Sequence, residues 1–223
     1  LHDASRVRVG PDTGLLARTA LAMALWMHGE VGRAIHWIGD ALDVALGLDH
    51  AYSIAYALFH NGYFATLRHR YEDALRFAAE LRGVAAENEY AIWEILSTVL
   101  EGSAMVHLGS TEDGLAKAEA GIDLYQGLSA PPVFWPYLLQ LRAEVHGAAG
   151  QTERALELID EVGRFTGEIH GAPPRTFVLK ADLLRALPDA DRSIIDELYR
   201  IEIDTARQLK LRMLELEACR QLV

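Results

Sequence analysis

The chain has 223 residues, of which 51% are hydrophobic and 24% charged, so it can bury a sizeable core. Its formal net charge of -11 repels a phosphate backbone and argues against direct binding of nucleic acid. The single cysteine, Cys219, excludes an internal disulfide, and we interpret it as a small buried residue of the last helix. No apolar run is long enough to cross a bilayer, and no signal peptide follows Leu1. We therefore expect a cytoplasmic protein with no membrane contact.

Apolar residues recur at helical spacing along the whole chain, whereas the alternation typical of strands is weak. The sequence predicts helices in pairs, in which a tight turn joins the two members and a looser turn leads to the next pair. In chain order the pairs are 13–28 with 31–47, 53–68 with 71–86, 89–108 with 111–127, 132–148 with 152–167, and 174–187 with 190–208, and a final helix begins near 212.

The predicted helix boundaries carry turn and capping residues. Gly29, Gly109 and Gly150 suit the positive φ at which many helices end. The segments GST (109–111) and GQT (150–152) offer hydroxyl N-caps to the helices that follow. Two APP segments, at 130–132 and 172–174, are expected to stop one helix and open the next.

These boundaries repeat with a steady period. The tight turns begin at 29, 69, 109, 150 and 190, which gives intervals of 40, 40, 41 and 40 residues. Two helices joined by so short a turn lie close together, so small residues are expected at fixed distances from each turn. Eight of the ten positions that lie seven before or five after these points are Ala or Gly. Seven residues before the turns stand Ala22, Gly62, Gly102, Ala143 and, as the exception, Leu183. Five residues after the turn starts stand Ala34, Ala74, Gly114, Ala155 and, as the exception, Ile195.

A small residue, a glycine turn seven positions later and an alanine five beyond resemble the tetratricopeptide (TPR) pattern, whose usual unit has about 34 residues. The fold class expected is all-α: a TPR-like right-handed α-solenoid of about five helix pairs plus a C-terminal helix. Because no polar linker divides the chain, residues 1–223 are expected to form a single superhelical domain.

Three segments carry a closer resemblance: ALAMALWMHGEVGRAI (20–35), YSIAYALFH (52–60) and IDTARQLKLRMLELEAC (203–219). They are similar to the C-terminal TPR region of large bacterial predicted ATPases of the signal-transducing (STAND) NTPase class, which carry an adenylate or guanylate cyclase domain or a LuxR-type DNA-binding domain. Two features depart from that pattern: the segment PDA at 188–190 and Glu202. The resemblance therefore does not fix the geometry of the last helix pair. The resemblance implies a regulatory and scaffolding fragment of a larger multidomain protein.

The chain lacks the sequence motifs of nucleotide and metal chemistry. It contains no GxxxxGK followed by Ser or Thr, no GxGxxG, no HExxH and no CxxC. We therefore expect no enzyme activity, no cofactor and no metal site in this chain. His28, His69, His107 and His146 lie near the ends of predicted first helices, where they are expected to cap carbonyl groups. The four tryptophans, Trp26, Trp37, Trp93 and Trp135, are expected in packing contacts.

The repeat register places a set of aromatic and polar residues on the concave face of the solenoid. This mixture suits a peptide or a helix better than a phosphate, although several of these residues could instead pack against the next repeat, and Glu144 could pair with Lys180. The candidate groove residues are Tyr56, Phe59, Tyr63, Ser103, Tyr137, Gln140, Glu144 and Lys180.

The function expected is that of a non-catalytic regulatory and protein-interaction module of a bacterial signalling protein. It would bind a partner, a peptide or other domains of its own polypeptide through the concave groove, and it could self-associate. The alternative is a small-molecule sensor whose concave pocket closes on an inducer. A deep closed pocket at the concave centre would favour the sensor, whereas a long open groove would favour a peptide or protein. An enzyme would need convergent acid and base residues, and the sequence shows none.

Overall fold

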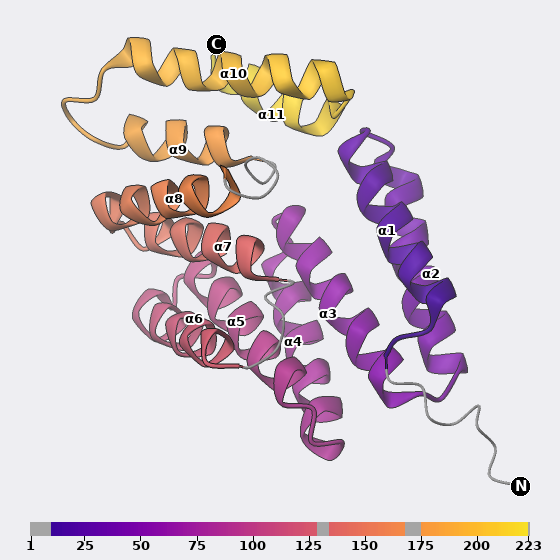
Figure 1. Ribbon diagram of the computed structural model, residues 1–223. Coiled ribbons are helices and arrows are strands. Elements are labelled where there is room, and N and C mark those ends of the chain that lie inside the picture. The colour runs from indigo at the N-terminus through magenta and orange to yellow at the C-terminus, as the bar shows by residue number, and fades with distance from the viewer. Residues whose placement is uncertain (1–9, 129–133, 168–174, 223) are drawn as a thin grey trace, which may run out of the picture.

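The computed structural model describes residues 10–128, 134–167 and 175–222, and within these ranges the chain forms eleven α-helices and no strand (Figure 1). The all-α class and the arrangement of five helix pairs plus a C-terminal helix are confirmed. The helices are α1 (Thr13–Met27), α2 (Val31–Gly47), α3 (Ala51–Leu67), α4 (Tyr71–Glu87), α5 (Ala91–His107), α6 (Thr111–Gln126), α7 (Trp135–Ala148), α8 (Thr152–Gly167), α9 (Thr176–Arg185), α10 (Arg192–Leu209) and α11 (Arg212–Gln221).

The helices stack in order along the chain. Each odd-numbered helix from α1 to α9 packs against the even-numbered helix that follows it and, from α3 onward, against the one that precedes it. The odd-numbered helices also contact one another in succession from α1 to α9. They therefore form one continuous layer, and the residues of this layer that face away from the even-numbered helices line the inner side of the solenoid.

The tight turns follow the predicted period. Gly29, Gly109 and Gly150 have φ values of 84°, 96° and 77°, and His69 takes the same left-handed conformation at 54°. The fifth turn differs, because α9 ends at Arg185 and no residue between it and α10 has a positive φ. The departure at 188–190 therefore coincides with a change in turn geometry.

The predicted hydroxyl cap at Ser110 is wrong, since its side chain makes no capping hydrogen bond. The tight turn already ties the Ser110 amide to the Met105 carbonyl at 2.9 Å, and the backbone ψ of 62° is not that of an extended cap residue. Thr152 is the first residue inside α8. Carboxylates act as N-caps of two other helices, α1 and α10. Asp12 accepts hydrogen bonds from the amides of Gly14 and Leu15, and Asp191 accepts one from the amide of Ser193. The two APP segments, 130–132 and 172–174, lie outside the described residues.

The small residues beside each turn bring paired helices into close backbone contact. A Cβ atom added to Gly102 of α5 would lie 2.6 Å from the Gly114 carbonyl oxygen of α6 and also against the Ala118 amide nitrogen. The exceptions in the last pair, Leu183 and Ile195, are buried at 5% and 6% exposure. The Leu183 side chain packs against α7 and α8, whereas that of Ile195 packs against α9.

The solenoid curves until its two ends meet. Helix α1 contacts α11, and the Arg212 Cβ atom lies 3.4 Å from the position that a Cβ on Gly29 would take. Figure 1 shows the indigo helix α1 approaching the yellow helix α11 at one side of the stack. Within the described ranges, no helix combines the length and the hydropathy that a bilayer-crossing segment needs.

Candidate binding cavity

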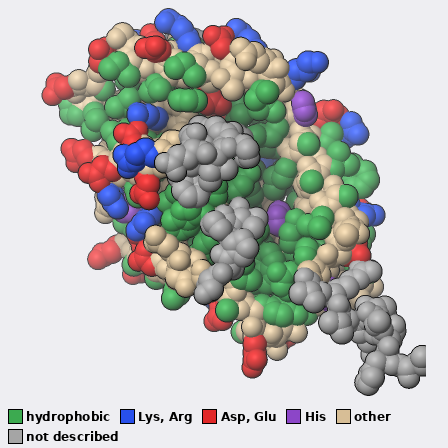
Figure 2. Space-filling model, in the orientation of Figure 1, with side chains coloured by type: hydrophobic (Ala, Val, Ile, Leu, Met, Phe, Trp, Pro, Cys, Tyr) green, Lys and Arg blue, Asp and Glu red, His purple; other side chains and the backbone are tan. Residues whose placement is uncertain are grey.

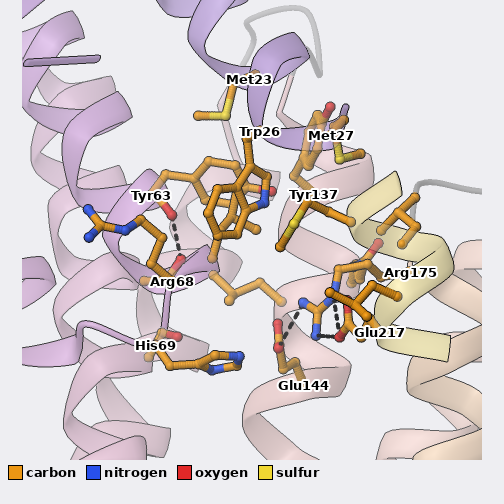
Figure 3. Close-up of a pocket in the computed structure, with 18 of the residues that line it drawn as sticks. Met23, Trp26, Met27, Tyr63, Arg68, His69, Tyr137, Glu144, Arg175 and Glu217 are labelled. Atoms are coloured by element: carbon orange, nitrogen blue, oxygen red, sulfur yellow. Dashed lines mark hydrogen bonds and ion pairs between the residues drawn. The ribbon is translucent and has the colours of Figure 1, made fainter. Parts of the chain in front are cut away.

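A cavity of about 730 Å³ lies on the inner side of the solenoid. Its walls come from the odd-numbered helices α1, α3, α5, α7, α9 and α11 and from the turns beside them (Figure 3). Because α1 and α11 belong to opposite ends of the chain, the curvature of the whole stack is what encloses this space. Figure 2 shows hydrophobic side chains gathered toward the centre of one face, with most charged side chains near its rim.

One side of the cavity is apolar and aromatic. Met23, Trp26 and Met27 of α1 face Tyr63 of α3 and Tyr137 of α7 across it (Figure 3). The Tyr63 and Tyr137 rings pack edge to face, with centroids 5.9 Å apart and planes at 76°. Burial raises the pKa of Tyr63, and the nearby Tyr137 and Glu144 raise it further, so the phenol stays protonated.

The other side is ionic and centres on Arg175. Its Nε atom donates to both oxygens of Glu217, at 2.9 and 3.0 Å, and its Nη2 atom donates to Glu217 Oε1 at 2.7 Å. Its Nη1 atom makes a single longer contact with Glu144 Oε1, at 3.3 Å. Burial alone would lower the pKa of Arg175, but the two carboxylates outweigh it and raise the pKa, so the guanidinium stays charged. One cation thus links α7 to α11.

The backbone of Arg175 is held in a conformation that non-glycine residues rarely adopt, with φ at 72°. Glu202 of α10 is 4% exposed and accepts from the amides of Arg175 and Phe177. Burial raises the pKa of Glu202, and the two amides oppose that rise. The residue at which the sequence departs from the repeat pattern therefore caps the start of α9, and this cap positions the Arg175 side chain toward the cavity.

A stacked aromatic pair, His107 and Tyr71, also lines the cavity. The rings of His107 and Tyr71 are 4.2 Å apart with an interplanar angle of 5°, and His69 Nδ1 lies 2.9 Å from the Tyr71 hydroxyl. Burial lowers the pKa of His107, and burial with the Glu144 charge raises that of Tyr71 to about 12. Both groups are therefore neutral near pH 7.

The expectation that the histidines cap carbonyl groups is wrong where the structure gives them partners. His69 and His107 contact Tyr71, as described above, and His146 contacts Gln151 Oε1 at 2.7 Å and Glu119 Oε1 at 2.9 Å. These imidazoles find side-chain partners because the turn backbones already satisfy the last carbonyls of α3, α5 and α7.

Five of the eight predicted groove residues line the cavity: Tyr63, Ser103, Tyr137, Gln140 and Glu144. Tyr56 and Phe59 instead belong to an aromatic cluster around Trp93, and Tyr56 lies 3.1 Å from the Thr19 hydroxyl. Lys180 pairs with Asp160 at 2.5 Å and Glu144 with Arg175, so the alternative Glu144–Lys180 pair does not form. The inward register therefore holds for Tyr63 of α3 and for the predicted residues of α5 and α7, and it fails at Tyr56 and Phe59 of α3 and at Lys180 of α9.

The structure adds residues that the repeat register did not identify. Trp26 and Met27 lie on the side of α1 that faces the opposite end of the stack, Arg175 lies in a turn, and Leu216 and Glu217 belong to α11. The repeat pattern covers only the paired helices, so it gave no signal for a turn or for α11. Trp26 was expected in packing, and it does pack edge to face on Phe64, with centroids 5.3 Å apart, while also facing the cavity.

Metal-ligating side chains do not converge in the described part of the chain, where no group of three or more His, Cys, Asp or Glu could hold an ion. Three ionic residues of the cavity pair with one another: the Glu144 and Glu217 carboxylates share the Arg175 guanidinium. Such an arrangement can bind a ligand through charge and hydrogen bonds.

No protein-family model matches the sequence, and no curated protein matches it. Among solved structures, it is similar to a putative kinesin light chain of Podosopora anserina with nearly identical TPR-like repeats, with a TM-score of 0.51 and 15% identity over 90% of this chain and 94% of that one. A point variant of that protein gives a TM-score of 0.51 at 15% identity, over 89% and 95% of the two chains. At this identity the likeness shows the fold alone, and the chain is a TPR-like α-solenoid.

Proposed function

We propose that this chain is the regulatory and protein-interaction module of a bacterial signalling protein and that its cavity receives a short segment of a partner. Repeat solenoids of this kind bind through their concave surfaces, because stacked units present a continuous inner face. The resemblance of residues 20–35, 52–60 and 203–219 to signal-transducing NTPases supports the signalling context. The partner is then another protein or another domain of the same polypeptide.

One observation carries this proposal: large apolar side chains stay exposed inside the cavity. Tyr137 of α7 is 49% exposed and Leu216 of α11 is 55% exposed, and both line the same space. An exposed aromatic residue in a concave site is the kind of anchor that dominates binding energy at protein interfaces. A partner side chain between α7 and α11 would cover both.

The size of the cavity limits what can enter. An α-helix is about 10–12 Å wide and rises 1.5 Å per residue, so 730 Å³ corresponds to about five residues of helix. The cavity therefore takes a short segment, and a longer partner would have to continue outside it.

A second candidate, the small-molecule sensor, is favoured by the contact between α1 and α11. That contact closes the ring around the cavity, and the volume of about 730 Å³ falls within the range of about 300–1,000 Å³ that is usual for small ligands. The sensor and the peptide module would use the same lining residues.

The test is selection of peptides from a random library on the immobilised chain. We expect binders that lose at least tenfold in affinity on Tyr137→Ala, because the exposed ring that anchors the partner would be removed without adding a charge. The matched control is Leu124→Ala, since Leu124 of α6 is 60% exposed and lies outside the cavity.

Two other outcomes would contradict the peptide module. Binders insensitive to Tyr137→Ala would place recognition elsewhere on the surface. If no peptide is selected, while a metabolite collection yields a compound whose thermal stabilisation of the chain is lost in Tyr137→Ala, the sensor is the correct function.

A further inference from the structure

We propose that the partner segment is anchored in the cavity by a basic side chain, whose cation lies against Gln140 and Glu144 of α7. This inference rests on the proposed function and specifies the chemistry that the site recognises. Lysine and arginine side chains both supply the chemistry that this site would recognise, a cation on an alkyl stem.

The first support is an unsatisfied acceptor at the cavity wall. The Gln140 Oε1 atom is buried and has no hydrogen-bond partner in the described part of the chain. A buried polar atom without a partner is costly, and such atoms are rare in native proteins. Gln140 also lines the cavity, so a rotation of its side-chain amide would bring this acceptor to a ligand donor there.

The second support is the weak pairing of Glu144, one helical turn further along the same face of α7. Glu217 accepts three of the four hydrogen bonds from Arg175 and Glu144 accepts only the 3.3 Å contact. Two carboxylates thus share a single guanidinium, which leaves negative charge at Glu144. A ligand cation would pair with Glu144 without breaking the bidentate contact to Glu217.

The third support is the apolar surface beside these acceptors. The rings of Tyr63 and Tyr137 line the same cavity as Gln140 and Glu144. Figure 3 shows Tyr63, Tyr137 and Glu144 around this cavity. Aromatic faces attract cations, and lysine and arginine stems pack along apolar surface while their charged ends reach polar groups.

The other charges of the cavity do not favour an anionic ligand. Arg175 is already held by Glu217 and Glu144, so an anion would have to displace a carboxylate. The Arg68 guanidinium lies 5.8 Å from the Phe64 ring centroid and, in Figure 3, on the side of the cavity away from Arg175. Arg220, at the end of α11, is exposed to solvent. The net charge of -11 also draws cationic partners toward the chain.

The experiment measures the affinity of four capped alanine pentapeptides whose central residue is Arg, Lys, Gln or Glu, with calorimetry or NMR titration of the full chain. We expect the Arg and Lys peptides to bind at least tenfold more tightly than the Gln and Glu peptides. Agmatine, which carries the same guanidinium on an alkyl stem without a peptide backbone, is titrated beside them. Equal affinity for agmatine and the Arg peptide would mean that the peptide backbone adds nothing to binding, and it would contradict a peptide as the source of the cation.

Variants test the two residues separately. Glu144→Gln should lower the affinity for the Arg peptide about tenfold, and Gln140→Leu should lower it several-fold while leaving the melting temperature unchanged or higher. Glu157→Gln is the matched control, because Glu157 pairs with Arg154 on the exposed surface of α8, outside the cavity.

The outcomes separate this inference from the proposed function. If the selected library peptides bind the cavity but the central charge of the pentapeptides makes no difference, the basic anchor is wrong and the interaction module stands. If no peptide of either kind binds, both proposals fall.

Discussion

Gly102 lies where the backbones of α5 and α6 approach too closely for a side chain. Even a methyl group there would meet the Gly114 carbonyl and the Ala118 amide, so Gly102→Ala should lower the free energy of unfolding by about 1–3 kcal/mol, as overpacking does. Gly83 of α4 has open space around it, so Gly83→Ala should raise that free energy by about 0.5–1 kcal/mol. Urea unfolding of both variants checks the opposite signs, and equal effects would mean that the α5–α6 contact is misplaced.

His60 should make stability depend on pH. Its ring stacks on Tyr56 with centroids 4.0 Å apart, and its Nδ1 atom is hydrogen-bonded to the Tyr56 carbonyl at 2.8 Å. Burial lowers the pKa of His60 to about 4, and the hydrogen bond only partly opposes this. Between pH 6.5 and 4 the unfolded chain therefore binds a proton that the folded chain does not, and folding loses up to about 3 kcal/mol as the pH falls through that range.

The check on His60 is the free energy of unfolding at pH 7 and pH 4.5 for the parent chain and for His60→Gln. The parent should lose more stability than the variant between the two values. If the two chains lose the same amount, the imidazole titrates normally in the folded state.

Which single residues line the cavity could be predicted only in part. The register found Tyr63, Gln140 and Glu144 because a helix places residues three and four apart on one face, so the period fixes which of them point inward. It could not find Arg175, whose place depends on a left-handed turn held by Glu202 of another helix. Glu202 was recognised as a departure from the pattern, but its hydrogen bonds are long-range and leave no local signal.

At the scale of elements, Arg175 fastens the last helix to the stack. Glu217→Gln should remove the charge and one of the two acceptor oxygens of the bidentate partner and lower the free energy of unfolding by about 1–3 kcal/mol, because Glu144, at 3.3 Å, would be the one carboxylate left beside the Arg175 guanidinium. The Arg154–Glu157 pair of α8 is the control, since both side chains are about half exposed or more and such pairs contribute about 0–1 kcal/mol. Chemical unfolding measures both, and a Glu217 variant as stable as the control would show that α11 docks without this ion pair.

The helices themselves were largely predictable from the sequence. Helical spacing and the turns that begin at Gly29, His69, Gly109 and Gly150 set the first four pairs. The state of Ser110 could not be predicted from its residue type, because the backbone hydrogen bonds of the turn decide its conformation and its side chain does not cap α6. Helix α9, expected over 174–187, is shorter, because it begins at the cap made by Glu202 and ends at Arg185 without a left-handed residue.

At the scale of the whole molecule, the curvature was not predictable. A repeat pattern specifies how each unit meets its neighbours, whereas the curvature is the sum of small rotations over the whole stack. Only that sum decides that α1 meets α11 and that a cavity is enclosed between them. For the same reason, residues from the two chain ends, Trp26 and Leu216, were missed as cavity residues.

Four methionines offer a direct test of the central claim that the cavity is the binding site. Met23, Met27 and Met213 line it, whereas Met105 lies between α5 and α6, near Gly114, and does not. The measurement is the ¹³C-methyl NMR spectrum of the methionine-labelled chain, titrated with a peptide selected from the library. The cavity account predicts that the methyl signals of Met23, Met27 and Met213 shift as the peptide saturates the chain while that of Met105 stays in place. Saturation with the three cavity methyl signals unmoved would contradict it.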